Sequence, residues 1–109
     1  MSIPVRYKET AIIPVKGPIT RRILAHAPSL MTVEFTFSAP FIDTPHSHVH
    51  EQISVVIEGK FEFNMDGKLF PMGPGDSIFF PSNVLHCVNC IEPGKLVDAF
   101  TPRRDDFLK

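Results

Sequence analysis

Apolar and polar residues alternate along short stretches of this chain, and turns separate the stretches. The alternation is strict over Leu30–Ala39, where every second residue is apolar and the residues between are polar. The apolar residues there are Met31, Val33, Phe35, Phe37 and Ala39. Because residues two apart in an extended chain share one face, the pattern predicts a strand with one face in the core and one in water.

Similar strands are predicted along most of the chain. They lie at Ile53–Glu58, Lys60–Met65, Ser77–Phe80, Val84–Cys90 and Leu96–Thr101. Asp66-Gly67 is a strong hairpin turn signal, and 11 prolines and 6 glycines interrupt every candidate helix. We expect eight to ten strands, as in a sandwich or barrel. No repeat or linker is visible, so residues 1–109 are predicted to form one all-β domain.

The same alternation predicts an association surface. If Gln52 points inward, Ser54 does too, and Ile53, Val55 and Ile57 point outward. Three apolar β-branched residues on an outer face indicate a homodimer, with the N-terminal stretch 12–15 as a possible cover. A β-bulge that reverses the register is the alternative.

Composition and charge exclude several classes of partner. The net charge is −1, from 11 basic and 12 acidic residues without a basic stripe, so a nucleic-acid partner is not expected. No apolar run is long enough to span a membrane, and the first residues lack the apolar core of a signal peptide, so a cytoplasmic location is expected. Cys87 and Cys90 are an odd number of residues apart, which favours buried thiols over a redox pair.

Histidines at alternate positions are the strongest chemical signal. His46 and His48 precede an apolar strand, Gln52 has the same parity, and His86 lies downstream. In an extended chain the first three share a face and can converge on one ion, with His86 completing a mixed nitrogen and oxygen set. Such a set suits a first-row divalent metal. The alternative is a group of exposed polar residues in a loop.

The identity of the metal stays open among Zn, Ni, Mn and Fe, because affinity order and supply decide it more than these ligands do. Neutral Gln52 should leave the ion a stronger Lewis acid that is held less tightly than by a carboxylate. His50 has ligand parity, but with four ligands already present it is interpreted as a supporting or rim group. Arg21, Arg22 and His26 are interpreted as solvated strand residues, with a place at the pocket mouth as the alternative.

Two stretches of the chain resemble the motifs of the cupin family. The first is H-x-H, three residues, Gln52, six residues and Gly59, where the family normally carries Glu in place of Gln52. The second is matched by Gly75, Pro81 and His86 at the expected spacing. Asn83 stands in place of a glycine, and Cys90 in place of an asparagine. The resemblance implies a cupin double-stranded β-helix, that is, a jelly-roll barrel.

The C-terminal stretch is similar to the closing strand of small KdgF-type cupins, which act on 4,5-unsaturated uronates released from pectin or alginate. Asp98, Phe100 and Arg104 match a D-x-F-x-x-x-R spacing whose residues line the pocket beside the metal in that family. The residue types suit an anionic sugar: Arg104 can bind a carboxylate, Phe100 can support a ring, and Asp98 can move a proton. The alternative for Arg104 is a surface ion pair with Asp105 or Asp106.

The resemblance implies that the protein converts the ring form of an unsaturated uronate to its linear keto form. A small anionic sugar-like molecule is then the expected substrate, and a divalent metal would polarise the oxygen on which charge develops. Two other functions stay open, because one barrel hosts many chemistries. They are a metal-dependent dioxygenase or other oxidoreductase, and a non-catalytic module that binds a small ligand.

Overall fold

A computed structural model describes residues 4–109 as an antiparallel β-structure with two short 3-10 helices. The strands are β1 (Ile13–Lys16), β2 (Ile19–Ala27), β3 (Leu30–Phe37), β4 (Glu51–Met65), β5 (Lys68–Met72), β6 (Ser77–Phe80) and β7 (His86–Thr101), and the helices are η1 (Tyr7–Glu9) and η2 (Asp105–Leu108). No α-helix occurs in this part of the chain, and none of its helices could cross a membrane. The predicted all-β class is confirmed.

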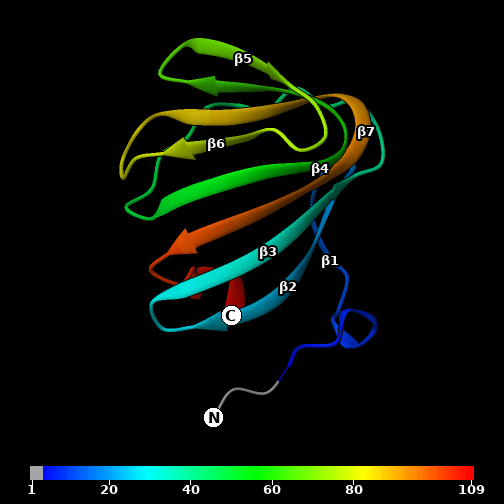
Figure 1. The fold of residues 1–109 in the computed structure, drawn as a ribbon, viewed down its shortest axis with the longest axis vertical. Helices are drawn as coiled ribbons and strands as arrows, with labels where there is room; N and C mark the ends of the chain where they lie inside the picture. The colour runs from blue at the N-terminus through cyan, green and yellow to red at the C-terminus, as the bar shows by residue number, and fades with distance from the viewer. Residues whose placement is uncertain (1–3) are drawn as a thin grey trace.

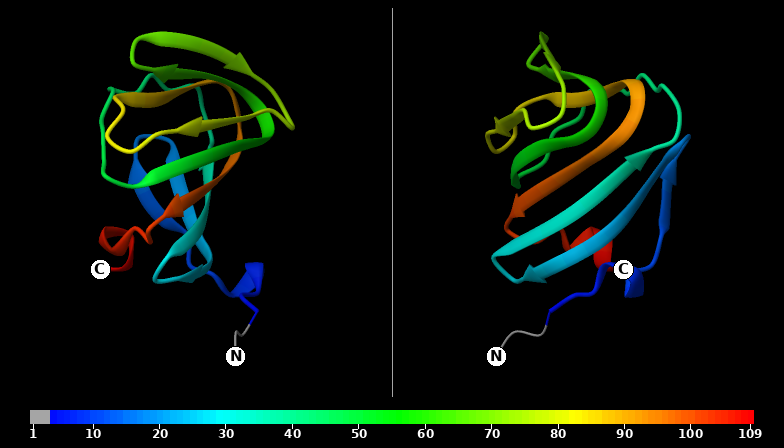
Figure 2. Two further views of the ribbon diagram at one scale, coloured as in Figure 1. Left: turned by 60° about the vertical axis from the view of Figure 1, so that its left-hand side comes forward. Right: turned by 45° about the vertical axis from the view of Figure 1, so that its right-hand side comes forward.

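The strands form one curled sheet (Figure 1). Its order is β1-β2-β3-β7-β4-β5, and β6 pairs with the first part of β4, beside the part that pairs with β5. β4 and β7 form the longest ladder, and both curve strongly, so that the sheet turns back on itself (Figure 2). This curled antiparallel sheet is the predicted jelly-roll barrel.

The expected number of eight to ten strands is wrong, because two pairs of predicted strands are continuous. β4 runs through Gly59 and β7 runs through Gly94. The described residues therefore form 7 strands, all in one sheet. Gly59 has φ +86°, and a Cβ atom on Gly94 would overlap the carbonyl of Glu58. Two strands can bend together here only because neither glycine carries a side chain. We call the place where Gly59 of β4 lies against Gly94 of β7 the corner.

Most local predictions agree with the structure. In β3, Met31 and Val33 are 0% exposed and Phe37 is 3% exposed, as the alternation predicts. Asp66 and Gly67 both have positive φ, which is the backbone of a tight hairpin turn between β4 and β5. The main core cluster consists of Ile19, Phe37, Val56, Phe61, Phe63, Phe80, Cys90 and Leu96.

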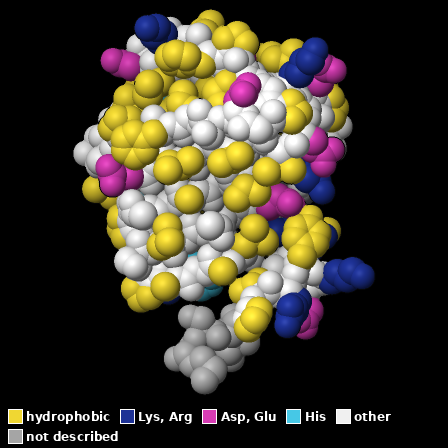
Figure 3. Space-filling model, in the orientation of Figure 1, with side chains coloured by type: hydrophobic (Ala, Val, Ile, Leu, Met, Phe, Trp, Pro, Cys, Tyr) yellow, Lys and Arg dark blue, Asp and Glu magenta, His cyan; other side chains and the backbone are white. Residues whose placement is uncertain are grey.

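The predicted inward and outward faces of β4 are confirmed. Ser54 and Val56 are buried at 0% and 1% exposure, whereas Ile53 and Ile57 are 45% and 49% exposed and Val55 is half-buried. The register of β4 against β7 is regular up to Val56, so no bulge reverses this stretch. Hydrophobic side chains are spread over the face of the molecule seen in Figure 3. β1 does not cover the outward residues of its own β4, because it pairs with β2 at the other end of the sheet.

Candidate functional site

Three histidines meet at one end of the barrel. His46 and His48 lie in the connection between β3 and β4, and His86 is the first residue of β7. Backbone hydrogen bonds of 2.8 Å in both directions join His46 to His86 and hold the connection against β7. The metal-binding atoms of His46, His48 and His86 all lie within 4.8 Å of one another. The structure thus forms a cluster from positions that are distant in the sequence.

Hydrogen bonds orient two of these rings. The Nδ1 atom of His86 lies 2.9 Å from the carbonyl oxygen of Val84, and that of His48 lies 3.0 Å from the carbonyl oxygen of His50. Because a carbonyl oxygen only accepts, each Nδ1 carries the proton and each Nε2 presents a lone pair. The Nε2 of His86 is buried and has no hydrogen-bond partner among the described residues. Metal-binding histidines characteristically have this arrangement.

Gln52 completes the polar group beside His48. The side chain is 8% exposed, and its amide nitrogen donates to the hydroxyl of Ser54 at 2.9 Å and to the carboxyl of Asp98 at 3.1 Å. These bonds direct the amide oxygen toward Nε2 of His48, 3.1 Å away. Two lone pairs then face each other, and a cation bound by both atoms would remove the repulsion.

The histidines are in the form that binds metals. Burial lowers the pKa of His86 to about 4, and burial followed by the nearby charge of Arg104 lowers the pKa of His48. Both imidazoles are therefore neutral at neutral pH, as metal coordination requires. Together with the unpartnered Nε2 of His86, this donor set fits a divalent metal ion. The three-histidine site is compatible with a metal, and its identity stays open.

A cavity of about 250 Å³ opens beside the cluster. His46, Gln52, Phe100 and Arg104 line one part of it, and core side chains such as Phe37 and Leu96 line another. The ion-paired Lys16 and Asp43 also lie on its wall. The ring of Phe100 is 2% exposed and lies 6.1 Å from that of His48, centre to centre. A pocket of this size holds a small molecule against both apolar surface and polar groups.

Arg104 lines this cavity and is also ion-paired. Its Nε and Nη2 atoms donate to the carboxylate of Asp106 at 3.1 and 2.9 Å, which is one of the partners considered from the sequence. Its guanidinium lies 5.2 Å from the ring centre of Phe100. The bonds to Arg104 hold the pKa of Asp106 below its ordinary value. The ion pair and the pocket position therefore coexist.

Asp98 lies behind Gln52 and does not line the cavity. The carboxyl is 5% exposed, its Oδ2 accepts the bond from Gln52, and its Oδ1 is buried without a partner in the described chain. Burial raises the pKa of Asp98 to about 7, against the opposite effects of a hydrogen bond from Ser54 and the charge of Arg104. A carboxyl of this pKa can both give and take a proton near neutral pH.

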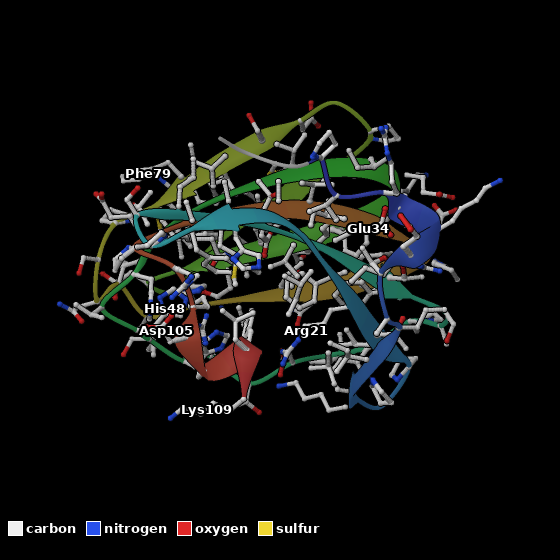
Figure 4. The ribbon with its side chains drawn as sticks, turned by 90° about the horizontal axis from the view of Figure 1, so that it is seen from below. Arg21, Glu34, His48, Phe79, Asp105 and Lys109 are labelled. Atoms are coloured by element: carbon white, nitrogen blue, oxygen red, sulfur yellow. The ribbon has the colours of Figure 1, made fainter. Side chains whose placement is uncertain are left out.

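The side chain of Arg21 also lines the cavity, although the sequence favours a solvated position. Its guanidinium lies 3.8 Å from the ring centre of Phe107, which belongs to the C-terminal turn. In the view from below, this turn lies between the labelled His48 and Arg21 (Figure 4). The signal was present in the sequence: Arg21 stands between Ile19 and Ile23, on the apolar face of an alternating strand.

Three other candidate residues have different surroundings. His50 supports His48 through its backbone carbonyl, and its ring is outside the cluster. Cys87 and Cys90 are free and buried, and burial raises the pKa of both thiols. Unreactive buried thiols are therefore the better description of both cysteines.

Comparison with known proteins gives relatives for most of this chain. Residues 33–100 match the family model described as the cupin domain. The chain is 38% identical over 92 residues to the pectin degradation protein KdgF of Dickeya dadantii, which covers 83% of this chain and 84% of the relative. It is 35% identical to the solved structure of KdgF from Halomonas sp., with a TM-score of 0.92 over 98% of this chain and 99% of that one. An RmlC-like cupin from Shewanella frigidimarina is 34% identical, with a TM-score of 0.92 and coverage of 98% and 96%.

Proposed function

The chain belongs to the cupin family and, within it, to the KdgF-type cupins, and from this premise we propose that it converts ring-form 4,5-unsaturated uronates to their linear keto forms. One observation carries the proposal. The three-histidine cluster and Gln52 lie at a cavity that also presents an aromatic ring and guanidinium groups. A sugar acid needs these features: apolar contact for its ring, cations for its carboxylate, and a site where charge on oxygen is stabilised.

We propose that His46, His48, Gln52 and His86 hold one divalent metal. When bound, the metal would polarise a substrate oxygen and stabilise negative charge that develops there. The supporting evidence is the set of lone pairs at the cluster, above all the buried and unpartnered Nε2 of His86. Gln52 holds its amide oxygen beside the cluster because its amide nitrogen is bonded to Ser54 and Asp98.

The protein side chains have separate roles in this proposal. Phe100 supports the sugar ring, and Arg104 binds the carboxylate with the donors that Asp106 leaves free. Loss of the proton from the C1 hydroxyl forms an aldehyde and breaks the bond between C1 and the ring oxygen, which leaves an enolate over C4 and C5. Delivery of a proton to C4 turns the enolate into the ketone, so the net change is an isomerisation. Asp98 is proposed to accept and return this proton, because its pKa of about 7 permits both steps. Since Gln52 separates Asp98 from the cavity, the proposal requires a water molecule that carries the proton between the carboxyl and the substrate.

The reaction is tested by following the loss of the ultraviolet absorbance of an unsaturated uronate while dissolved oxygen is monitored. Turnover without oxygen consumption supports the isomerisation. Oxygen consumption would favour a dioxygenase, and tight binding without either would favour a binding module. If Asp98→Asn leaves turnover unchanged while His86→Ala abolishes it, the metal site stands and the acid/base role of Asp98 falls.

Metal binding is tested separately by elemental analysis of protein purified without a histidine tag. We expect about one divalent ion per chain in the unmodified protein and a large loss of metal in His48→Ala. Full metal content in His48→Ala would refute the ligand assignment.

We also propose that the protein is a homodimer. Its outward β4 face carries Ile53 and Ile57, and β6 adds Phe79, which pairs with Ile53 and is 47% exposed. Burying such a row against a second copy removes apolar surface from water. Light scattering after size-exclusion chromatography should give twice the mass of the chain, and Ile53→Lys should give the mass of one chain.

A further inference from the structure

We propose that Arg21 is a specificity-determining residue that binds the carboxylate of the substrate beside Arg104. The inference rests on the proposed uronate function and adds a second cation to it. Arg21 and Arg104 both line the cavity next to His46 and Gln52, Arg21 from β2 and Arg104 from the C-terminal segment just before η2. The ring of Phe107 contacts both guanidinium groups, which lie 3.8 and 4.3 Å from its centre.

The position of Arg21 in β2 is unusual for a charged residue. Its neighbours of the same parity, Ile19 and Ile23, pack in the two apolar clusters of the barrel, and its partner in β3 is Phe35. Its Nε atom is buried and has no hydrogen-bond partner within residues 4–109. A buried donor without a partner destabilises the protein. Such a group on a cavity wall is explained when a ligand supplies the missing acceptor.

Arg104 has only part of its guanidinium left for a ligand, the end formed by Nη1 and the second N–H of Nη2. Its Nε and Nη2 atoms already bind both oxygens of Asp106. Arg21 has no ion pair among the described residues, and Asp106 acts on it only as a nearby charge. The Nη groups of Arg21 make no hydrogen bond within the described chain and are therefore available for a carboxylate, which guanidinium groups bind in a bidentate manner.

Phe107 positions this pair. Its ring packs edge-on against Phe35 and Phe100, at centre distances of 6.3 and 5.7 Å, and so joins the C-terminal turn to the cavity wall. Stacking on Phe107 restricts the guanidinium of Arg21 without using its hydrogen-bond donors. The donors remain free for an anion in the cavity.

The adjacent residue Arg22 is a matched control. It has the same side chain on the opposite face of β2, where it lies over the ring of Tyr7 and donates to Thr10. It does not line the cavity. A change at Arg22 removes the same charge from the same strand and leaves the proposed carboxylate site intact.

The test compares Arg21→Gln, Arg21→Lys and Arg22→Gln as metal-loaded proteins. Turnover is measured with an unsaturated galacturonate and with its methyl ester, which lacks the negative charge. Arg21→Gln should raise KM for the acid by about 10- to 100-fold with little change in kcat, which corresponds to the loss of a charge-assisted hydrogen bond. KM for the ester should stay unchanged. Arg21→Lys should show a smaller rise for the acid, and Arg22→Gln should behave as the unmodified protein.

An unchanged KM for the acid in Arg21→Gln, or an equal rise for acid and ester, would overturn the inference, because equal loss indicates a packing role. Should Arg21→Gln fail to fold, Arg21→Lys is judged by the same ratio of acid to ester. Absence of turnover in the unmodified protein would refute the proposed reaction. The role of Arg21 is then tested by calorimetry, which compares the affinities for galacturonate and for galactose. A preference for galacturonate that Arg21→Gln removes supports anion binding by Arg21, and no such preference overturns it.

Discussion

The corner divides the ladder of β4 and β7 into two halves. Alternate side chains point inward in both halves, but the inward side chains differ in kind. On one side of the corner the inward residues are aromatic, with Phe61 and Phe63 each 1% exposed. On the other side Gln52, Ser54 and Asp98 occupy equivalent inward positions and bond to one another. The aromatic half removes apolar surface from water, which stabilises the fold. The polar half buries groups that cost stability and serve the candidate site.

The two halves differ in what a substitution is expected to change: the aromatic half mainly determines stability, and the polar half mainly determines the candidate site. In the aromatic half a truncated side chain leaves a cavity, so stability falls. In the polar half the buried carboxyl of Asp98 has one oxygen without a partner among residues 4–109, so a substitution can increase stability while it damages the site. The predictions below test this contrast, in order of the expected change in the free energy of unfolding.

The largest effect is expected where the halves join. Gly94→Ala places a Cβ atom against the carbonyl of Glu58 and the backbone of Gly59, neither of which can move without breaking the ladder. We expect a loss of about 4 kcal/mol or more in the free energy of unfolding, measured by urea denaturation. Gly73→Ala is the control, because a Cβ there has no atom within 4 Å. Equal midpoints for both variants would show that the corner is not closely packed.

The next effect concerns the aromatic half alone. Phe63→Ala removes a ring that lies 6.0 and 6.5 Å from those of Phe80 and Phe61, and we expect a loss of about 3 to 4 kcal/mol. Leu69→Ala, in the paired strand β5 and 51% exposed, should change stability by less than about 1 kcal/mol. Similar unfolding midpoints for the two variants would contradict the division of the ladder.

A smaller effect of opposite sign is expected in the polar half. The folded protein holds the pKa of Asp98 at about 7, above its ordinary value of 3.8, so between these values the folded state retains a proton that the unfolded state has lost. Stability of the metal-free protein should therefore fall as the pH rises through this window and level off above it. Asp98→Asn should remove that dependence and be more stable than the unmodified protein at pH 8, by on the order of a few kcal/mol.

Denaturation at several pH values measures this effect, and Ser54→Ala provides a comparison that keeps the carboxyl. A constant difference between Asp98→Asn and the unmodified protein from pH 4 to pH 8 would show that Asp98 does not titrate in this range.

The smallest effect on the metal-free fold is expected at the exposed edge of the cluster. His46→Ala keeps the backbone pairing with His86 and should change metal-free stability by less than about 0.5 kcal/mol. Added divalent metal should stabilise the unmodified protein by about 2.7 kcal/mol at one hundred times its dissociation constant. His46→Ala should lose most of this gain in thermal denaturation. An undiminished gain would remove His46 from the ligand set.

Much of the fold and of the candidate site could be read from local patterns. The alternation in β3 and β4 decides which side chains face inward, because successive residues of a strand point to opposite faces. His46 and His48 therefore share a side before any tertiary contact is known. Asp66-Gly67 predicts its turn from the backbone conformations that these residues tolerate. Such features depend on neighbours in the chain, and the resemblance to the cupin motifs adds their expected arrangement.

Only the tertiary structure decided how the ends of the ladder meet. β4 and β7 bend together at the corner. His86 pairs with Met65 in one half of the ladder, and Gln52 belongs to the other half. Because of the bend, both residues lie beside His48. The sequence pattern predicts four strands where the structure has two. A glycine in a turn and a glycine in a bent strand look the same in the local sequence.

The surroundings of each functional side chain were also decided by the tertiary structure. Parity places Asp98 inward but does not show that Gln52 separates it from the cavity. It places Arg21 on an apolar face but does not show that the C-terminal turn brings Phe107 and Arg104 to it. These contacts join residues far apart in the chain, and they follow from the curvature of the whole sheet. The sequence by itself determined which face each residue occupies, and the folded barrel determined what that face meets.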